Sequence, residues 1–213
     1  PGFAAWTVLN AVALGLYLWR FQRATGSGDT LSALAVALSF CAFFTFFLGQ
    51  VNVWLLICTG EFYLACARGR DLRGGLWLGG LLLKPQFLVL FGLGLLVGRR
   101  WKVLAGLVLA GLAVLALSLL LGGGPALLAM GQLLLLYPGN LPSTAPDWMM
   151  NWRSLAVNLS HLVPAAAAWA LAGAGLAVSV VATMVLWHRA RDLDPQSPAG
   201  VILGTAAASC TVA

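Results

Sequence analysis

The sequence predicts an all-α fold, a bundle of helices that crosses a membrane several times. Hydrophobic residues make up 61% of the 213-residue chain and only 8% of its residues are charged, whereas about a quarter of the residues in a soluble domain are charged. Long apolar runs, many of them close to the length of a helix that crosses roughly 30 Å of hydrocarbon, alternate with short basic linkers. These observations predict a single multi-pass membrane domain without a separate soluble domain.

The apolar runs define the expected spans. In chain order they cover residues 3–19, 31–48, 51–67, 103–121 and 163–187, with a partial span at 199–213. The external loop 122–162 begins at the helix-breaking Gly122–Pro125 and contains Ala126–Tyr137, which is too short to cross and is expected to form a helix along the membrane surface. The chain begins without methionine and stops inside an apolar run, so we expect a fragment that is incomplete at both ends.

The segment 74–98 is apolar except at its centre, where Lys84, Pro85 and Gln86 stand together. Proline lacks a backbone donor and disfavours helix at the residue before it, so the helix is expected to break at Lys84. A hairpin at this break would place ten of the 12 basic residues on the cytoplasmic side, whereas a single crossing would leave six there. The ten are Arg20, Arg23, Arg68, Arg70, Arg73, Arg99, Arg100, Lys102, Arg189 and Arg191. The positive-inside rule therefore favours a hairpin of two short helices.

Lys84 is the first candidate for function. Each half of the hairpin would rise only about 16 Å, so Lys84 is expected near the middle of the bilayer, facing protein or a water-filled cavity. Two compatible roles are open. Lys84 pairs with Glu61 of the third span, or it forms an anion site, open to the outer leaflet, for the phosphate of a lipid.

Gln50 and Asn52 flank the outer turn at Gly49. These amides either satisfy exposed helix ends or act as donors that line a cavity above the hairpin lysine.

Cationic clusters between apolar runs are what membrane topology produces, so the net charge of +6 does not imply a nucleic-acid partner.

Arg153 is the other basic residue outside the cytoplasmic set, within the stretch DWMMNWRSL. A guanidinium binds phosphate through two parallel hydrogen bonds, so Arg153 is a second candidate for a phosphate site. The same stretch contains Asn151, which suits a helix N-cap, and Asp147, the only one of the six carboxylates expected on the outer side. Asp147 is a secondary candidate for catalysis and also suits the cap of a turn.

Several enzyme classes are excluded. The sequence contains no nucleotide-binding glycine loop, no His/Cys metal set and no Ser/His/Asp arrangement. The four cysteines lie inside apolar runs without metal-ligand spacing. An enzyme of this composition is expected to use a donor embedded in the membrane, with no separate cofactor and no metal.

Four motifs in order resemble glycosyltransferase family 87: "LGQVN" (48–52), "RGRDLRGGLWLGGLLLKPQ" (68–86), "GRRWKVL" (98–104) and "NWRSL" (151–155). This family contains polyprenyl-phosphate-sugar-dependent transferases of the GT-C class, including bacterial mannosyltransferases. The resemblance implies a GT-C-like fold in the bacterial plasma membrane. It also implies inverting transfer of a hexose, with mannose expected, to a lipid or glycan acceptor on the outer face.

The resemblance also implies roles for individual residues. Those carried over to the donor phosphate and the acceptor are Gln50, Asn52, Lys84, Asn151 and Arg153. The family's catalytic aspartate lies in the first external loop, upstream of this chain. The family often has a histidine just before the asparagine of the NWRSL-like motif, whereas this chain has Met150.

Two other classes remain open from the residues alone. A broken helix with a charge near the midplane is also typical of transporters, although only one such break is found in this sequence. A non-catalytic membrane scaffold would use a Lys84–Glu61 pair to hold its helices together.

Overall fold

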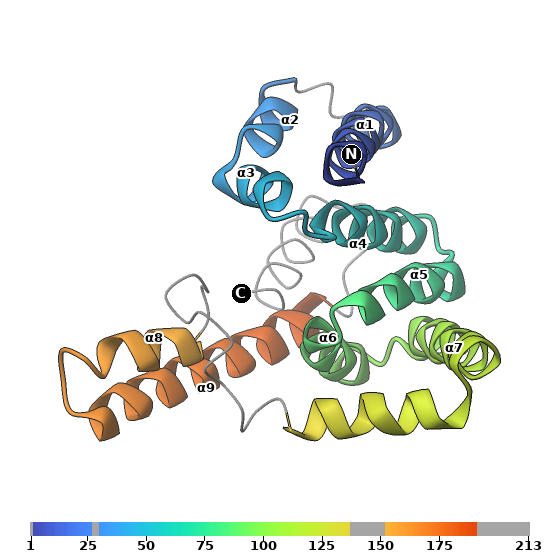
Figure 1. Cartoon of the computed structure of the whole chain (residues 1–213). Coiled ribbons are helices and arrows are strands. Elements are labelled where there is room, and N and C mark those ends of the chain that lie inside the picture. Colours follow the sequence, from blue (N-terminus) through green and yellow to red (C-terminus); the bar gives the residue numbers. More distant parts are fainter. Residues whose placement is uncertain (1, 27–29, 137–151, 191–213) are drawn as a thin grey trace. The chain divides into compact units, whose positions relative to one another are not determined.

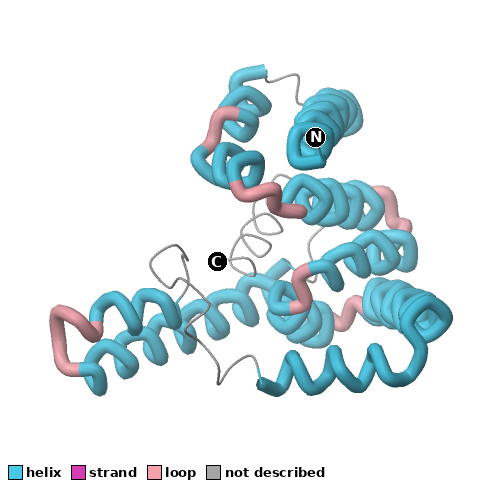
Figure 2. Tube along the Cα trace, in the orientation of Figure 1, coloured by secondary structure: helices cyan, strands magenta, loops and turns pink. Residues whose placement is uncertain are grey.

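All the secondary structure of the described residues is helical, as predicted. The computed structural model describes residues 2–26, 30–136 and 152–190. Its elements are α1 (Gly2–Thr25), α2 (Thr30–Ala37), α3 (Phe40–Phe47), α4 (Asn52–Ala67), α5 (Asp71–Leu78), the 3-10 helix η1 (Gly79–Leu83), α6 (Gln86–Val97), α7 (Trp101–Leu136), α8 (Trp152–Leu159) and α9 (Ala165–Ala190) (Figures 1 and 2). They form two compact units: Pro1–Leu88 with Trp101–Ala110, and Val89–Arg100 with Gly111–Ala213.

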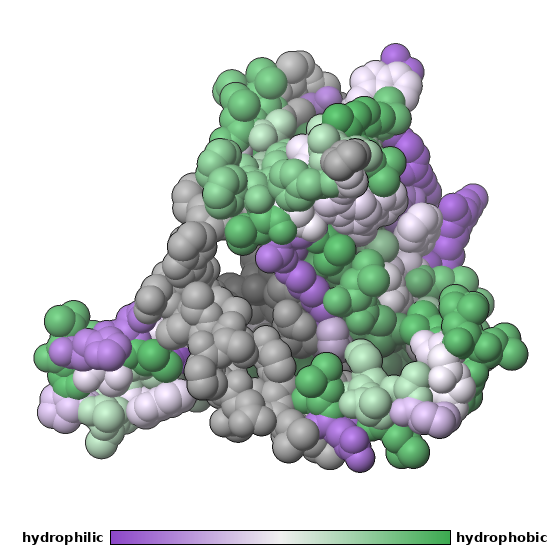
Figure 3. Space-filling view, viewed as in Figure 1, coloured by the Kyte–Doolittle hydropathy of each residue, from purple (hydrophilic) through white to green (hydrophobic). Residues whose placement is uncertain are grey.

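Three of the described helices are long and apolar enough to cross a membrane. They are Gly2–Thr25, Trp101–Leu133 and Ala165–Arg189, and α4 is a shorter apolar helix. Large apolar side chains cover much of the described surface (Figure 3), and Leu120 and Leu121 on α7 are 83% and 81% exposed. Lipid would cover such side chains at little cost, because a hydrocarbon chain is as apolar as leucine. The expected partial span at 199–213 lies outside the described residues.

The expected span 31–48 consists of two helices. α2 ends at Ala37 and α3 begins at Phe40. Ser39 caps α3, because its Oγ accepts a hydrogen bond from the Ala42 amide at 3.2 Å while donating to the Val36 carbonyl at 2.8 Å. A serine hydroxyl competes with the helical hydrogen bonds of its neighbours and favours a cap, which explains the interruption.

Helices α3 and α4 end in the same kind of turn, with a glycine in the left-handed conformation. Gly49 has φ +63° and Gly69 has φ +69°. In each turn the next amide reaches back to the helix: Gln50 to the Thr45 carbonyl at 2.9 Å, and Arg70 to the Ala65 carbonyl at 2.8 Å. These are Schellman turns, which satisfy the last carbonyls of a helix and define the direction of the chain that follows.

The helix break predicted at Lys84 is present. α5 tightens into η1, and Lys84 leaves the helix with φ −138° and ψ 79° before α6 begins at Gln86. The reversal of direction at this break stays a prediction, because most of α6 belongs to the other unit.

Glycines let α5 and η1 pack closely against α4 and the start of α7 within the first unit. A Cβ on Gly75 would overlap the Val103 carbonyl oxygen, and a Cβ on Gly106 would overlap the Leu72 carbonyl oxygen. A Cβ on Gly80 would overlap the Cys58 sulfur on α4. This close approach is the packing that small residues permit between membrane helices, and it anchors the segment that leads to Lys84.

In the second unit, α7 changes direction at the predicted break between Gly122 and Pro125. Gly123 has φ 69° and ψ −179°, which interrupts the helix (Figure 1). The position of the following helical segment along a membrane surface stays a prediction. α8 packs on α9, where the Trp152 indole donates to Ser179 Oγ at 3.1 Å.

Candidate functional site

The candidate site surrounds the ammonium of Lys84 in the first unit. Lys84 is half-buried and follows directly after η1, whose contacts with α4 determine where this lysine lies. Its amide donates to the Leu81 carbonyl at 2.9 Å, which is the last backbone bond of the 3-10 helix. Pro85 then prevents α5 and η1 from continuing as one helix into α6.

Two amide side chains hold the ammonium. Lys84 Nζ donates to Gln50 Oε1 at 2.7 Å and to Asn52 Oδ1 at 2.8 Å. Asn52 Nδ2 donates in turn to Thr45 Oγ1 at 3.1 Å, which is consistent with its oxygen facing the lysine. The structure thus brings together three of the residues that the sequence singled out, from the α3–α4 turn, α4 and the helix break.

The turn at Gly49 places Gln50 beside Lys84. Gln50 follows the left-handed glycine of the Schellman turn, and Trp6 Nε1 of α1 donates to the Gly49 carbonyl at 2.9 Å. The sequence predicts that Gln50 and Asn52 either satisfy exposed helix ends or act as donors that line a cavity. Their oxygens instead accept from Lys84, so they orient the cation without neutralising it.

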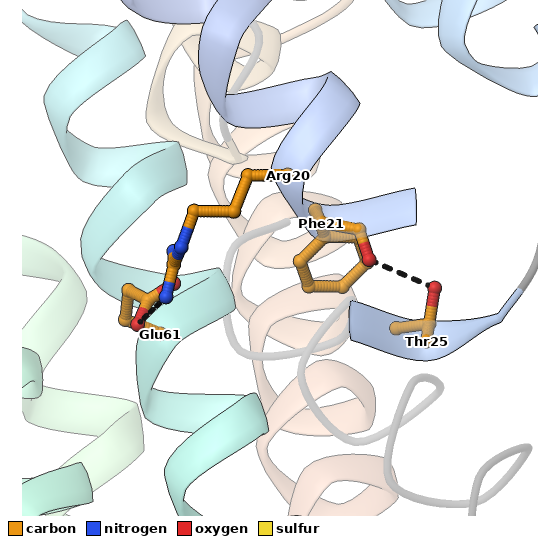
Figure 4. Close-up of polar contacts among 4 residues, drawn as sticks. All are labelled: Arg20, Phe21, Thr25 and Glu61. Atoms are coloured by element: carbon orange, nitrogen blue, oxygen red, sulfur yellow. Dashed lines mark hydrogen bonds and ion pairs between the residues drawn. The ribbon is translucent and has the colours of Figure 1, made fainter. Parts of the chain in front are cut away.

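The predicted pair of Lys84 with Glu61 is wrong. Both terminal nitrogens of the Arg20 guanidinium donate to the Glu61 carboxylate: Nη1 to Oε1, and Nη2 to Oε2 at 3.0 Å (Figure 4). Glu61 is only 5% exposed and Arg20 supplies its counter-charge from α1.

Helix geometry explains this correction. Asn52 and Glu61 are nine residues apart on α4, which is about 2.5 turns, so their side chains leave opposite faces of the helix. Asn52 faces Lys84 and Glu61 faces α1. A signal was present in the sequence, because Glu61 lies closer to the basic end of its span than to the outer end, within reach of a long arginine at the matching end of the first span.

The scaffold hypothesis depends on an ion pair between Lys84 and Glu61, and this pair is not formed, because Glu61 pairs with Arg20. Among the described residues, no carboxylate forms an ion pair with Lys84. Within the described residues, the half-buried ammonium therefore has no carboxylate beside it to compensate its charge.

The remaining predicted residues lie in the other unit or outside the described residues. Arg153 is half-buried, is the second residue of α8 and belongs to the other unit. Asn151 and Asp147 lie outside the described residues. Within the described part of the chain, no three His, Cys, Asp or Glu residues are grouped as metal ligands.

The arrangement is suited to binding an anion. An ammonium has three N–H donors, and the two amides use two of them. Among the described residues, nothing accepts from the third donor and no carboxylate compensates the charge, so both would be available to an oxyanion. Even a half-buried cation without a carboxylate partner is costly inside a membrane protein, which is a reason to expect a ligand for it.

These features define a helical membrane protein with a candidate anion site at a broken helix. Residues 1–212 match the model of glycosyltransferase family 87, so the chain belongs to this family. Membership indicates a membrane-bound glycosyltransferase, as the sequence motifs suggested. No curated protein and no solved structure matches the chain.

Proposed function

We propose that this chain forms the donor-phosphate part of an inverting GT-C glycosyltransferase. The enzyme transfers a hexose, expected to be mannose, from a polyprenyl-phosphate carrier to a lipid or glycan acceptor on the outer face of the bacterial plasma membrane. The observation that carries the proposal is the ammonium of Lys84, held by two amides and by no described carboxylate.

The charge balance favours phosphate as the ligand. Amide oxygens orient an ammonium through their dipoles but leave its net charge of one unchanged. Phosphate on a lipid supplies the missing negative charge while the polyprenyl chain stays in hydrocarbon. A charge-assisted hydrogen bond of this kind is about twice as strong as one between neutral groups.

The N-terminus of α6, which follows Lys84 in the chain, also favours phosphate as the ligand. α6 begins two residues after Lys84, so the first amides of this helix, which have no intrahelical acceptor, lie beside the lysine in the chain. A helix N-terminus attracts anions through these donors and through its dipole. The ammonium and the helix terminus would therefore act on one phosphate.

The proposed mechanism is a single displacement at the anomeric carbon. A carboxylate in an external loop accepts the proton of the acceptor hydroxyl, which attacks the sugar as the bond to the phosphate oxygen breaks. The leaving group is a lipid monophosphate whose negative charge grows in the transition state. Lys84 stabilises that charge, and we propose Arg153 as a second cation of the clamp.

Sugar transfer in membranes that contain the full-length protein tests the proposal. We expect transfer from a radiolabelled polyprenyl-phosphate hexose, inhibited by unlabelled polyprenyl monophosphate, which is the product. Counterflow of a solute across liposomes without such transfer would instead support the transporter alternative. Transfer that polyprenyl monophosphate does not inhibit would contradict the phosphate site.

A further inference from the structure

A second basic site lies in the first unit, away from Lys84. α1, α4, the α4–α5 turn and α5 surround a pocket lined by Arg20, Glu61, Ala65, Arg68, Arg70 and Arg73. Four arginines and one glutamate give the lining an excess of three positive charges. The proposed function uses none of these residues.

Three of the four arginines are available to a ligand. Arg20 is engaged by Glu61, which lies at the inner wall of the pocket. Among the described residues, none of Arg68, Arg70 and Arg73 forms an ion pair, and all three are exposed. Basic residues at the end of a span satisfy membrane topology without gathering around a pocket, so their arrangement needs a separate explanation.

The turn that carries these arginines is preorganised. Arg68 and Arg70 flank the left-handed Gly69 of the Schellman turn, and Arg73 lies in the first turn of α5, which packs on α4. A ligand bound here would not have to order the backbone, which removes one of the main costs of binding.

The pocket lies at the level where the apolar part of α1 ends. Trp19 is 54% exposed, and the Arg23 guanidinium lies 4.2 Å from the centre of its ring. Exposed tryptophan beside arginine is typical of the lipid headgroup region. On α5, the helix that carries Arg73, Leu72 and Leu76 are exposed and offer an apolar surface for acyl chains.

We propose that this pocket binds the phosphate of an anionic phospholipid in the leaflet that the arginines face, which the topology predicts to be the cytoplasmic leaflet. Guanidinium groups bind phosphate oxygens through paired hydrogen bonds, and the three free arginines converge on one concave surface. The exposed leucines favour a lipid over a soluble phosphate compound.

Lipid retention by the purified full-length protein tests this proposal. Native mass spectrometry would compare retained phosphatidylglycerol with phosphatidylcholine of the same acyl chains. The variant combines Arg68→Gln, Arg70→Gln and Arg73→Gln. A matched control combines Arg99→Gln, Arg100→Gln and Lys102→Gln, because it removes the same charge from the same predicted side of the membrane without touching the pocket.

We expect the wild type and the matched control to retain phosphatidylglycerol in preference to phosphatidylcholine. Surface charge alone accounts for about a fivefold loss of affinity per basic residue removed, in either triple variant, so the loss in the pocket variant should exceed this value and exceed the loss in the matched control. The single variants Arg70→Gln and Arg73→Gln provide the measurement if the triple variant does not fold. Inorganic phosphate in large excess should not displace the lipid.

Three results would overturn the proposal. Equal loss of phosphatidylglycerol from both triple variants would mean that only surface charge attracts it. Equal retention of the two lipids would exclude recognition of the headgroup charge. Complete displacement by inorganic phosphate would assign the pocket to a soluble anion.

Discussion

Replacing Lys84 with glutamine would remove the positive charge at the helix break while keeping a polar side chain that is one bond shorter. The glutamine amide can still donate to one of the two oxygens that Lys84 now holds at 2.7 and 2.8 Å. The variant therefore separates the charge of Lys84 from its contribution to folding.

The two expected effects differ in size. Losing one hydrogen bond at a half-buried site, where water can replace it, should lower the free energy of unfolding by about 1 kcal/mol. Losing the cation that faces the leaving phosphate should lower kcat by about 10²- to 10³-fold, as removal of one preorganised donor from an oxyanion site does. The protein should remain folded while transfer nearly stops.

The assay is transfer of radiolabelled hexose from polyprenyl phosphate, with thermal unfolding measured on the same preparation. Asn52→Asp is an informative second variant, because it leaves Lys84 intact and places a carboxylate against the ammonium. The new ion pair should preserve or raise the unfolding temperature, yet it competes with phosphate and should also lower the transfer rate.

Either of two results would refute this reasoning. A Lys84→Gln variant with more than a third of the wild-type rate would mean that the charge is not used in catalysis. An Asn52→Asp variant that is stabilised and fully active would mean that Lys84 serves only to join the α3–α4 turn to the helix break.

Three further predictions concern stability, measured by thermal unfolding of the purified protein. Gly106→Leu should lower the free energy of unfolding by about 3 kcal/mol or more, because the leucine side chain would overlap the backbone of α5. Gly111 faces open space, so Gly111→Leu serves as the control. Equal effects of the two substitutions would contradict the close packing of Gly106. Arg20→Ala should lower the free energy of unfolding by about 3 kcal/mol, because it leaves the buried Glu61 carboxylate unpaired. Glu61→Gln should lower it by only about 1 kcal/mol, because the Arg20 side chain is half-exposed and water can solvate it. A larger loss for Glu61→Gln than for Arg20→Ala would count against the ion pair. Ser39→Ala should lower the free energy of unfolding by about 1 kcal/mol, because it removes the N-cap of α3, whereas Ser39→Thr keeps the capping hydroxyl. Equal stability of the two variants would argue against the cap.

The helix breaks show which features could be read from the sequence. Pro85 disrupts its own neighbourhood whatever the surrounding helices do, and the predicted break at Lys84 is confirmed. The break around Gly123 was likewise visible as a run of glycines before a proline. The break at Ser39 was not predicted, because one serine within an apolar run is as compatible with a continuous helix as with a cap.

The candidate site was predicted in part. Lys84, Gln50 and Asn52 were singled out as polar residues in apolar surroundings, and the structure brings them together. The partner of Glu61 was missed, because the choice between Lys84 and Arg20 depends on which face of α4 meets which helix.

By itself, the sequence determined that the chain is helical, that it belongs in a membrane and where its helices break, because hydrophobicity and the backbone chemistry of proline and glycine act locally. Only the tertiary structure decided which charges are neutralised. Pairing depends on the rotation and depth of each packed helix, and these follow from contacts such as that of Gly60 on α4 with Tyr17 on α1, between residues far apart in the chain. That packing directs Glu61 towards Arg20 and leaves the ammonium of Lys84 hydrogen-bonded to two amides, with no ion pair to a carboxylate among the described residues.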